Sequence, residues 1–68
     1  MNTPLRVGDR VHNAAFGVGT VTGFGYEEGC GEHVIVQFDG DAGLVSIYRF
    51  RLRRIIGTTE GGSLILGP

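Results

Sequence analysis

The sequence predicts an all-β protein, folded as a small five-stranded barrel with a single 3₁₀ turn before the last strand. Thirteen of the 68 residues are glycine, and no helical periodicity lasts longer than one turn. Short stretches alternate between apolar and polar residues, and Gly and Asp separate these stretches, which is typical of closely spaced strands. Short strands that curl into a barrel leave few edges exposed.

The first half of the chain predicts three strands. The first covers Arg10–Asn13, with Val7 and Val11 pointing inward. The second runs from about residue 19 to residue 26, and its glycines permit sharp coiling. The third is centred on 34–38, where every second residue is apolar and faces the core.

The second half predicts two more strands and the connections between them. Residues 27–32 form a long acidic hairpin loop, whereas 39–43 contain the Asp-Gly signal of a tight hairpin. Leu44–Tyr48 forms the fourth strand. Residues 49–52 are too few for a helix and favour a 3₁₀ turn, which leads into the fifth strand at Arg53–Ile56.

One domain accounts for the whole chain, because 68 residues bury only a small core. We assign the barrel to residues 1–56. The remaining residues, 57–68, start with a linker-like stretch and end in a short apolar run. They form either a flexible tail, which we favour, or an added edge strand of this or a neighbouring copy.

The composition indicates where in the cell the protein is expected and which kinds of binding it disfavours. The formal net charge is −1, so no global positive field draws the chain to nucleic acid. The only cysteine, Cys30, fits a reducing cytosol, and we expect a cytoplasmic protein. Cys30, His12 and His33 lack the spacing of a metal site. We expect no membrane contact, while self-association remains open as a way to stabilise so small a core.

Four segments carry a first resemblance: 7–13 (VGDRVHN), 16–21 (FGVGTV), 36–40 (VQFDG) and 52–55 (LRRI). They closely resemble the Tudor-like C-terminal domain of bacterial superfamily-1 DNA helicases. The resemblance implies an SH3-like, Tudor-like barrel. It also implies a free-standing, non-catalytic module that docks onto a transcription or DNA-processing assembly, with RNA polymerase as the type of partner.

A second resemblance rests on 45–48 (VSIY) together with the LRRI ending. These segments are similar to the plasmid-borne type II dihydrofolate reductases, which use the same barrel. In that family four copies surround a central pore that binds folate and NADPH. The resemblance implies that Ser46, Ile47 and Tyr48 of each copy would line such a pore.

Three departures from the reductase pattern favour binding over catalysis. The pore glutamine of that family corresponds to Ser46, its lysine after Gly-Asp-Arg-Val corresponds to Asn13, and its packing tryptophan has no equivalent. His12, His33 and Ser46 also lack the spacing of a catalytic triad. We therefore expect no cofactor, and an NADPH-dependent homotetrameric reductase is the alternative.

Aromatic and arginine residues form the candidate partner-binding site. Phe24 and Tyr26 share one face of the second strand, and Phe50 and Leu52 are expected to plug the end of the barrel. The complete candidate set is Phe24, Tyr26, Tyr48, Arg49, Arg51 and Arg54.

The arginines allow two interpretations. Either they form a positive edge for a partner, or Asp9, Glu32, Asp39 and Asp41 neutralise them within the chain. Because Asp39 and Asp41 would also repel phosphate, a protein partner is favoured and nucleic acid is the weaker possibility.

Overall fold

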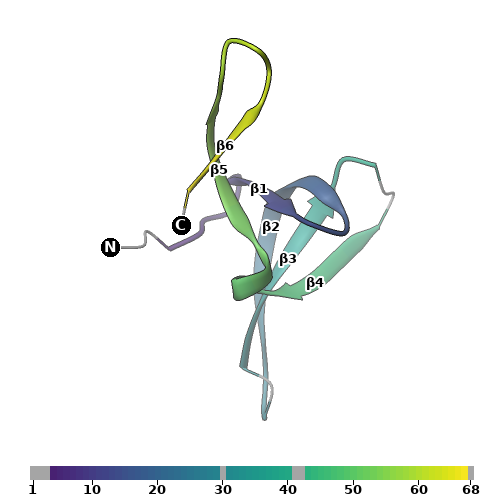
Figure 1. Cartoon of the computed structure of the whole chain (residues 1–68). Helices are drawn as coiled ribbons and strands as arrows, with labels where there is room; N and C mark the ends of the chain where they lie inside the picture. The colour runs from purple at the N-terminus through teal and green to yellow at the C-terminus, as the bar shows by residue number, and fades with distance from the viewer. Residues whose placement is uncertain (1–3, 30, 41–42, 68) are drawn as a thin grey trace.

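The computed structural model describes residues 4–29, 31–40 and 43–67, and the all-β prediction is confirmed (Figure 1). The chain forms six strands and one 3₁₀ turn, η1. Their bounds are β1 Arg10–Asn13, β2 Gly17–Glu27, β3 Gly31–Phe38, β4 Leu44–Tyr48, η1 Arg49–Arg51, β5 Arg53–Thr58 and β6 Leu64–Gly67.

All six strands belong to one sheet with the order β4-β3-β2-β1-β5-β6, and every neighbouring pair is antiparallel. Over the described residues the sheet is open, with β4 and β6 as its two edges. It therefore differs from the closed five-stranded barrel that we expected. The difference arises at β5, which takes β6 as its second neighbour, so that β5 and β6 leave the body of the sheet as a hairpin (Figure 1).

Several predicted bounds agree with the structure and others move. β1, β4 and the 3₁₀ turn lie where the sequence placed them. β2 runs on to Glu27 and β3 already begins at Gly31, so the loop between them is shorter than the predicted loop at 27–32. β5 runs on to Thr58, so the stretch that resembled a linker begins inside a strand, and residues 64–67 pair with β5.

The core is a cluster of apolar side chains on one face of the sheet. Alternate residues of β3 are buried, as the period of two predicted. The cluster consists of Leu5, Val11, Val21, Val34, Val36, Phe38, Ile47 and Leu52, with Val45 packed against it.

Two predicted core contacts are wrong. Val7 is 65% exposed, because the chain turns at this point: the Asp9 N–H donates to the Arg6 carbonyl at 3.0 Å and Gly8 has a φ of 97°. Leu5 takes the inward position instead. Phe50 is 78% exposed rather than a plug, because η1 turns its side chain outward and only the following Leu52 is buried.

Gly19 allows β2 and β3 to pack closely. A Cβ atom at this position would lie 2.7 Å from Cγ1 of Val36 and 2.8 Å from both the Gln37 carbonyl oxygen and Cδ1 of Phe38. Real Cβ atoms do not approach backbone oxygens so closely, so the two strands would have to separate.

We predict that Gly19→Ala lowers the free energy of unfolding by about 2 kcal/mol, the usual size of an overpacking penalty. Gly25→Ala is the matched control, because nothing lies within 4 Å of its added Cβ, and it should change stability by less than about 0.5 kcal/mol. Urea denaturation followed by circular dichroism measures both variants. Equal effects of the two substitutions would contradict this account of β2–β3 packing.

Candidate functional site

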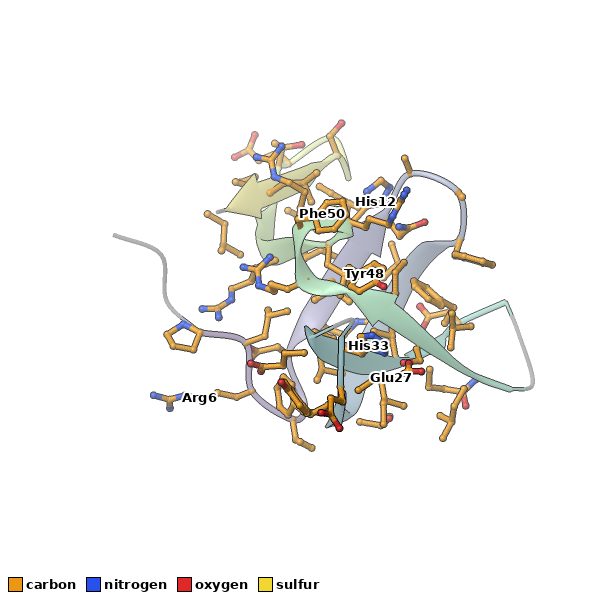
Figure 2. The ribbon with its side chains drawn as sticks, turned by 90° about the horizontal axis from the view of Figure 1, so that it is seen from below. Arg6, His12, Glu27, His33, Tyr48 and Phe50 are labelled. Carbon is orange, nitrogen blue, oxygen red and sulfur yellow. The ribbon has the colours of Figure 1, made fainter. Side chains whose placement is uncertain are left out.

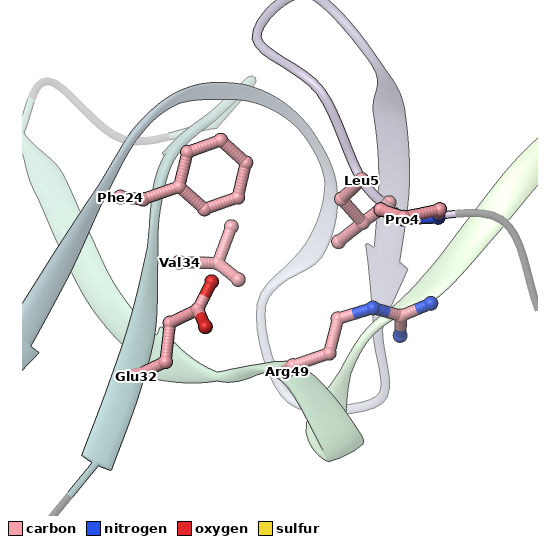
Figure 3. A pocket seen from close by; sticks show the side chains of 6 residues that line it. All are labelled: Pro4, Leu5, Phe24, Glu32, Val34 and Arg49. Carbon is pink, nitrogen blue, oxygen red and sulfur yellow. The ribbon is translucent and has the colours of Figure 1, made fainter.

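A pocket opens beside the core, between the β2–β3 hairpin and the segment that precedes β1 (Figure 3). Phe24 and Val34 form one wall and Pro4 and Leu5 form another, while Glu32 and Arg49 add one charge of each sign. The cavity measures about 180 Å³. Apolar walls with a few polar groups at the rim are typical of sites that hold one side chain or a small ligand.

A β-bulge decides that Phe24 lines this pocket. The β2–β3 register shifts between Val21 and Gly23, so Val21 pairs with Val36 and Phe24 pairs with Val34. The extra residue returns Phe24 to the core face, where a regular strand would have turned it away. Tyr26 follows on the same face and is 79% exposed.

Two of the candidate arginines brace this side of the molecule. Arg49 donates from Nη1 to the Leu52 carbonyl at 2.9 Å. Arg54 donates from Nη2 to the Pro4 carbonyl at 2.6 Å and lies 3.3 Å from an Asp9 carboxylate oxygen. Arg54 thereby anchors the segment that carries Pro4 and Leu5, which is a structural role next to the pocket.

A second surface, the aromatic patch, consists of His33, Tyr48, Phe50 and Arg51 (Figure 2). The Tyr48 and Phe50 rings stack with centroids 5.7 Å apart at 14°. His33 meets Tyr48 edge-on at 4.8 Å. The Arg51 guanidinium carbon lies 5.3 Å from the Phe50 ring centroid, within cation–π range.

The strand register assembles the aromatic patch. His33 pairs with Tyr48 and Ile35 pairs with Ser46, so these side chains share the sheet face opposite the core. Ile47 lies between Ser46 and Tyr48 in β4, points inward and is only 9% exposed. The register therefore places Tyr48 where the first residues of η1 can continue its ring stack.

Asn13 holds η1 in place from within the core. Its side chain is 6% exposed. Its Nδ2 donates to the Arg51 carbonyl at 3.0 Å, and its Oδ1 accepts from the Ala15 and Phe16 N–H groups at 2.8 and 2.9 Å. One amide thus connects the end of β1, the turn after it and the turn that carries Phe50.

The structure places Ser46 and His33 together, which the sequence did not predict. The His33 Nδ1 and the Ser46 Oγ are 3.1 Å apart. The His33 Nε2 is buried without a hydrogen-bond partner, so nothing orients the ring as a carboxylate does in a triad. Over the described residues no cluster of His, Cys, Asp and Glu is arranged for a metal ion. The two residues belong to different strands, and only the register shows that they meet.

Acidic side chains neutralise some of the arginines. Arg10 forms a two-pronged ion pair with Asp39, at 2.9 Å and 2.6 Å, and also donates to Thr20. Its guanidinium lowers the pKa of Asp39 below the ordinary value, chiefly through these hydrogen bonds. Arg54 pairs with Asp9, whereas Asp41 lies outside the described residues.

The candidate set divides between the two surfaces. Phe24, Tyr26, Arg49 and Arg54 lie on the pocket side, whereas Tyr48 and Arg51 belong to the aromatic patch. η1 joins the surfaces, because its first residue lines the pocket and its next two belong to the patch. The alternative pore residues divide as well, with Ser46 and Tyr48 exposed and Ile47 in the core.

No family model matches this chain, and searches of curated proteins and of solved structures give no match either. Within the part of the chain that the structure describes, no helix is long and apolar enough to cross a membrane.

We predict that Asn13→Ala lowers the free energy of unfolding by about 2–3 kcal/mol, because it removes the three hydrogen bonds between the buried amide and partly buried backbone groups. Thr59→Ala is the control. It removes an exposed hydroxyl that accepts from the Ser63 N–H at 3.1 Å and should cost less than about 1 kcal/mol. Thermal and urea unfolding provide the comparison. The role given to Asn13 fails if the two losses are the same.

The Asp39 carboxyl should titrate below its ordinary value, and Arg10→Met should return its pKa to that value. Because the folded-state pKa is lowered, the ion pair stabilises the fold above the unfolded-state pKa, near 4. That contribution disappears as the pH falls through the folded-state pKa. NMR titration of Asp39 measures the shift, with the exposed Arg6→Met as control. An unchanged Asp39 pKa in Arg10→Met would contradict the cause assigned here.

Proposed function

We propose that this chain is a non-catalytic interaction module that docks onto a protein of a transcription or DNA-processing assembly, with RNA polymerase as the type of partner. The aromatic patch is the main contact surface. The pocket beyond η1 receives a side chain of the same partner. Phe24, Tyr26 and Arg49 provide the contacts on the pocket side, next to Arg54, which braces this side.

The finer fold belongs to the same proposal. The first five strands follow the order β5-β1-β2-β3-β4, with a 3₁₀ turn between β4 and β5. This order and turn support an SH3-like, Tudor-like unit formed by β1–β5, as the first sequence resemblance implies. β6 is then an addition at the outer edge of β5.

The observation that carries the proposal is the exposed stack of Tyr48 and Phe50. Phe50 is 78% exposed although a core of this size has few large side chains to fill it. Stacking on Tyr48 and the nearby Arg51 hold the ring in one arrangement before any partner arrives. Ordered aromatic and arginine side chains are the groups that most often dominate binding energy at protein interfaces.

The charge distribution supports a protein partner over nucleic acid. Arg10 and Arg54 are paired with carboxylates, and Arg53 donates to the Gly67 carbonyl at 3.2 Å. The two ion pairs reduce the positive field that binding to a phosphate backbone requires. A single guanidinium beside exposed aromatic rings suits one carboxylate on a folded partner better than a row of phosphates.

The geometry supports this module better than the alternative reductase. In that family the three residues that correspond to Ser46, Ile47 and Tyr48 line the shared pore, but here Ile47 packs into the core of its own chain. Ser46 is already within hydrogen-bond distance of His33. Only Ser46 and Tyr48 are therefore placed to face another copy.

Phe50→Ala and Arg51→Glu should each weaken binding to purified bacterial RNA polymerase by at least about tenfold, the effect expected for the anchor residues of an interface. Arg6→Glu is the matched control, because Arg6 is also exposed and points away from the patch (Figure 2). Biolayer interferometry with the full chain measures the affinities. The proposal is overturned if the wild-type chain does not bind, or if the patch variants bind as tightly as Arg6→Glu.

A further inference from the structure

The β5–β6 hairpin projects from the body of the sheet (Figure 1). Its strands pair with each other, and among the described residues only β5 pairs with another strand, β1. No described side chain of residues 53–67 belongs to the buried apolar cluster. A two-stranded hairpin without a buried apolar cluster is only marginally stable in water. This one is joined to the body of the protein by β1 and by the contacts of Arg54, so a further contact would stabilise it.

Both faces of the hairpin carry apolar side chains between the arginines at its base and its polar tip. Ile56 covers Gly67, since a Cβ there would lie 2.9 Å from Ile56 Cγ2, and Ile65 lies over Gly57 on the same face. Ile56 and Ile65 are 61% and 41% exposed. On the other face, Ile55 pairs with Leu66. A solvated hairpin usually carries mainly polar residues on at least one face, so this pattern indicates a hairpin that makes a further contact.

The free edge of β6 is suited to pairing with its own copy. Charged residues and proline are two of the features that protect an edge strand from pairing. Residues 63–67 contain neither. Two copies of one strand can always pair antiparallel about a two-fold axis, because the contact is then the same on both sides.

The charges of the hairpin fit the same arrangement. Glu60, at the tip, is the only acidic residue between 53 and 67. Arg53 and Arg54 lie at the base, and Arg53 reaches the end of β6 by donating to the Gly67 carbonyl. An antiparallel β6–β6 pair sets the tip of one hairpin beside the base of the other. Each Glu60 then faces the arginine end of the partner hairpin, so the charges are complementary.

We propose that a second copy of this chain binds the hairpin through antiparallel pairing of β6 with β6, which places Ile65 beside side chains of the partner's β6. The pairing joins the two sheets edge to edge. It leaves both aromatic patches exposed, since each patch lies at the opposite end of its sheet. The inference goes beyond the docking function, and the dimer would present two docking surfaces at once.

Sedimentation equilibrium of the full chain, from micromolar to millimolar concentration, should show a monomer–dimer equilibrium. Ile65→Lys should raise the dissociation constant by at least about tenfold, because a charged side chain replaces an apolar one in the cross-strand contact and the two-fold axis brings two such charges close together. Leu44→Lys is the matched control, since Leu44 is 63% exposed on the opposite edge strand. This control should leave the constant within about twofold.

Charge reversal tests the antiparallel arrangement without touching the apolar face. Glu60→Arg and Arg53→Glu should each weaken the dimer, and the double variant should recover most of the loss. Circular dichroism confirms that every variant remains folded. A wild-type chain that stays monomeric at millimolar concentration overturns the proposal. So does a dimer that Ile65→Lys leaves intact, or a double variant no tighter than the single ones. Phe50→Ala should leave dimerisation unchanged, which separates this test from that of the docking function.

Discussion

The side chain of Asn13 is the constraint on which the rest of the arrangement depends. Among the described residues it is the polar side chain that is buried in the core, and all three of its hydrogen bonds reach backbone groups. An amide that gives up water must find partners, so its position fixes the chain around it. The hydrogen bond from Asn13 to the Arg51 carbonyl fixes the position of η1 relative to the core. Because η1 carries Phe50 outward, one buried amide determines where the exposed aromatic ring lies.

The two surfaces show how a small sheet separates stability from recognition. The inward residues of β3 and β4 fill the core, while His33 and Tyr48, outward residues of the same strands, form the aromatic patch together with Phe50 and Arg51 of η1. η1 then brings the patch next to the pocket, so that a single partner segment can contact both. His33, which meets the Tyr48 ring edge-on, is also within hydrogen-bond distance of Ser46.

Sequence alone predicted the features that depend on local pattern. The alternation in β3 identified the core face, and the shortness of the stretch after Tyr48 identified the 3₁₀ turn. It did not predict the features that depend on strand register or on the direction in which a side chain points. The bulge at Thr22 turns Phe24 toward the pocket, and strand pairing brings His33 to Ser46. The outward direction of Phe50 depends on tertiary contacts that no local signal contains. The pairing of residues 64–67 with β5 corresponds to one of the two alternatives that the sequence left open.

The central claim is that the aromatic patch is the contact surface of a docking module. The most direct measurement is an NMR titration of the isotopically labelled chain with purified bacterial RNA polymerase, followed residue by residue. The account predicts that the largest shifts and intensity losses occur at His33, Tyr48, Phe50 and Arg51, with smaller changes at Phe24 around the pocket. Perturbations confined to other surfaces, or none at all at saturating polymerase, would contradict it.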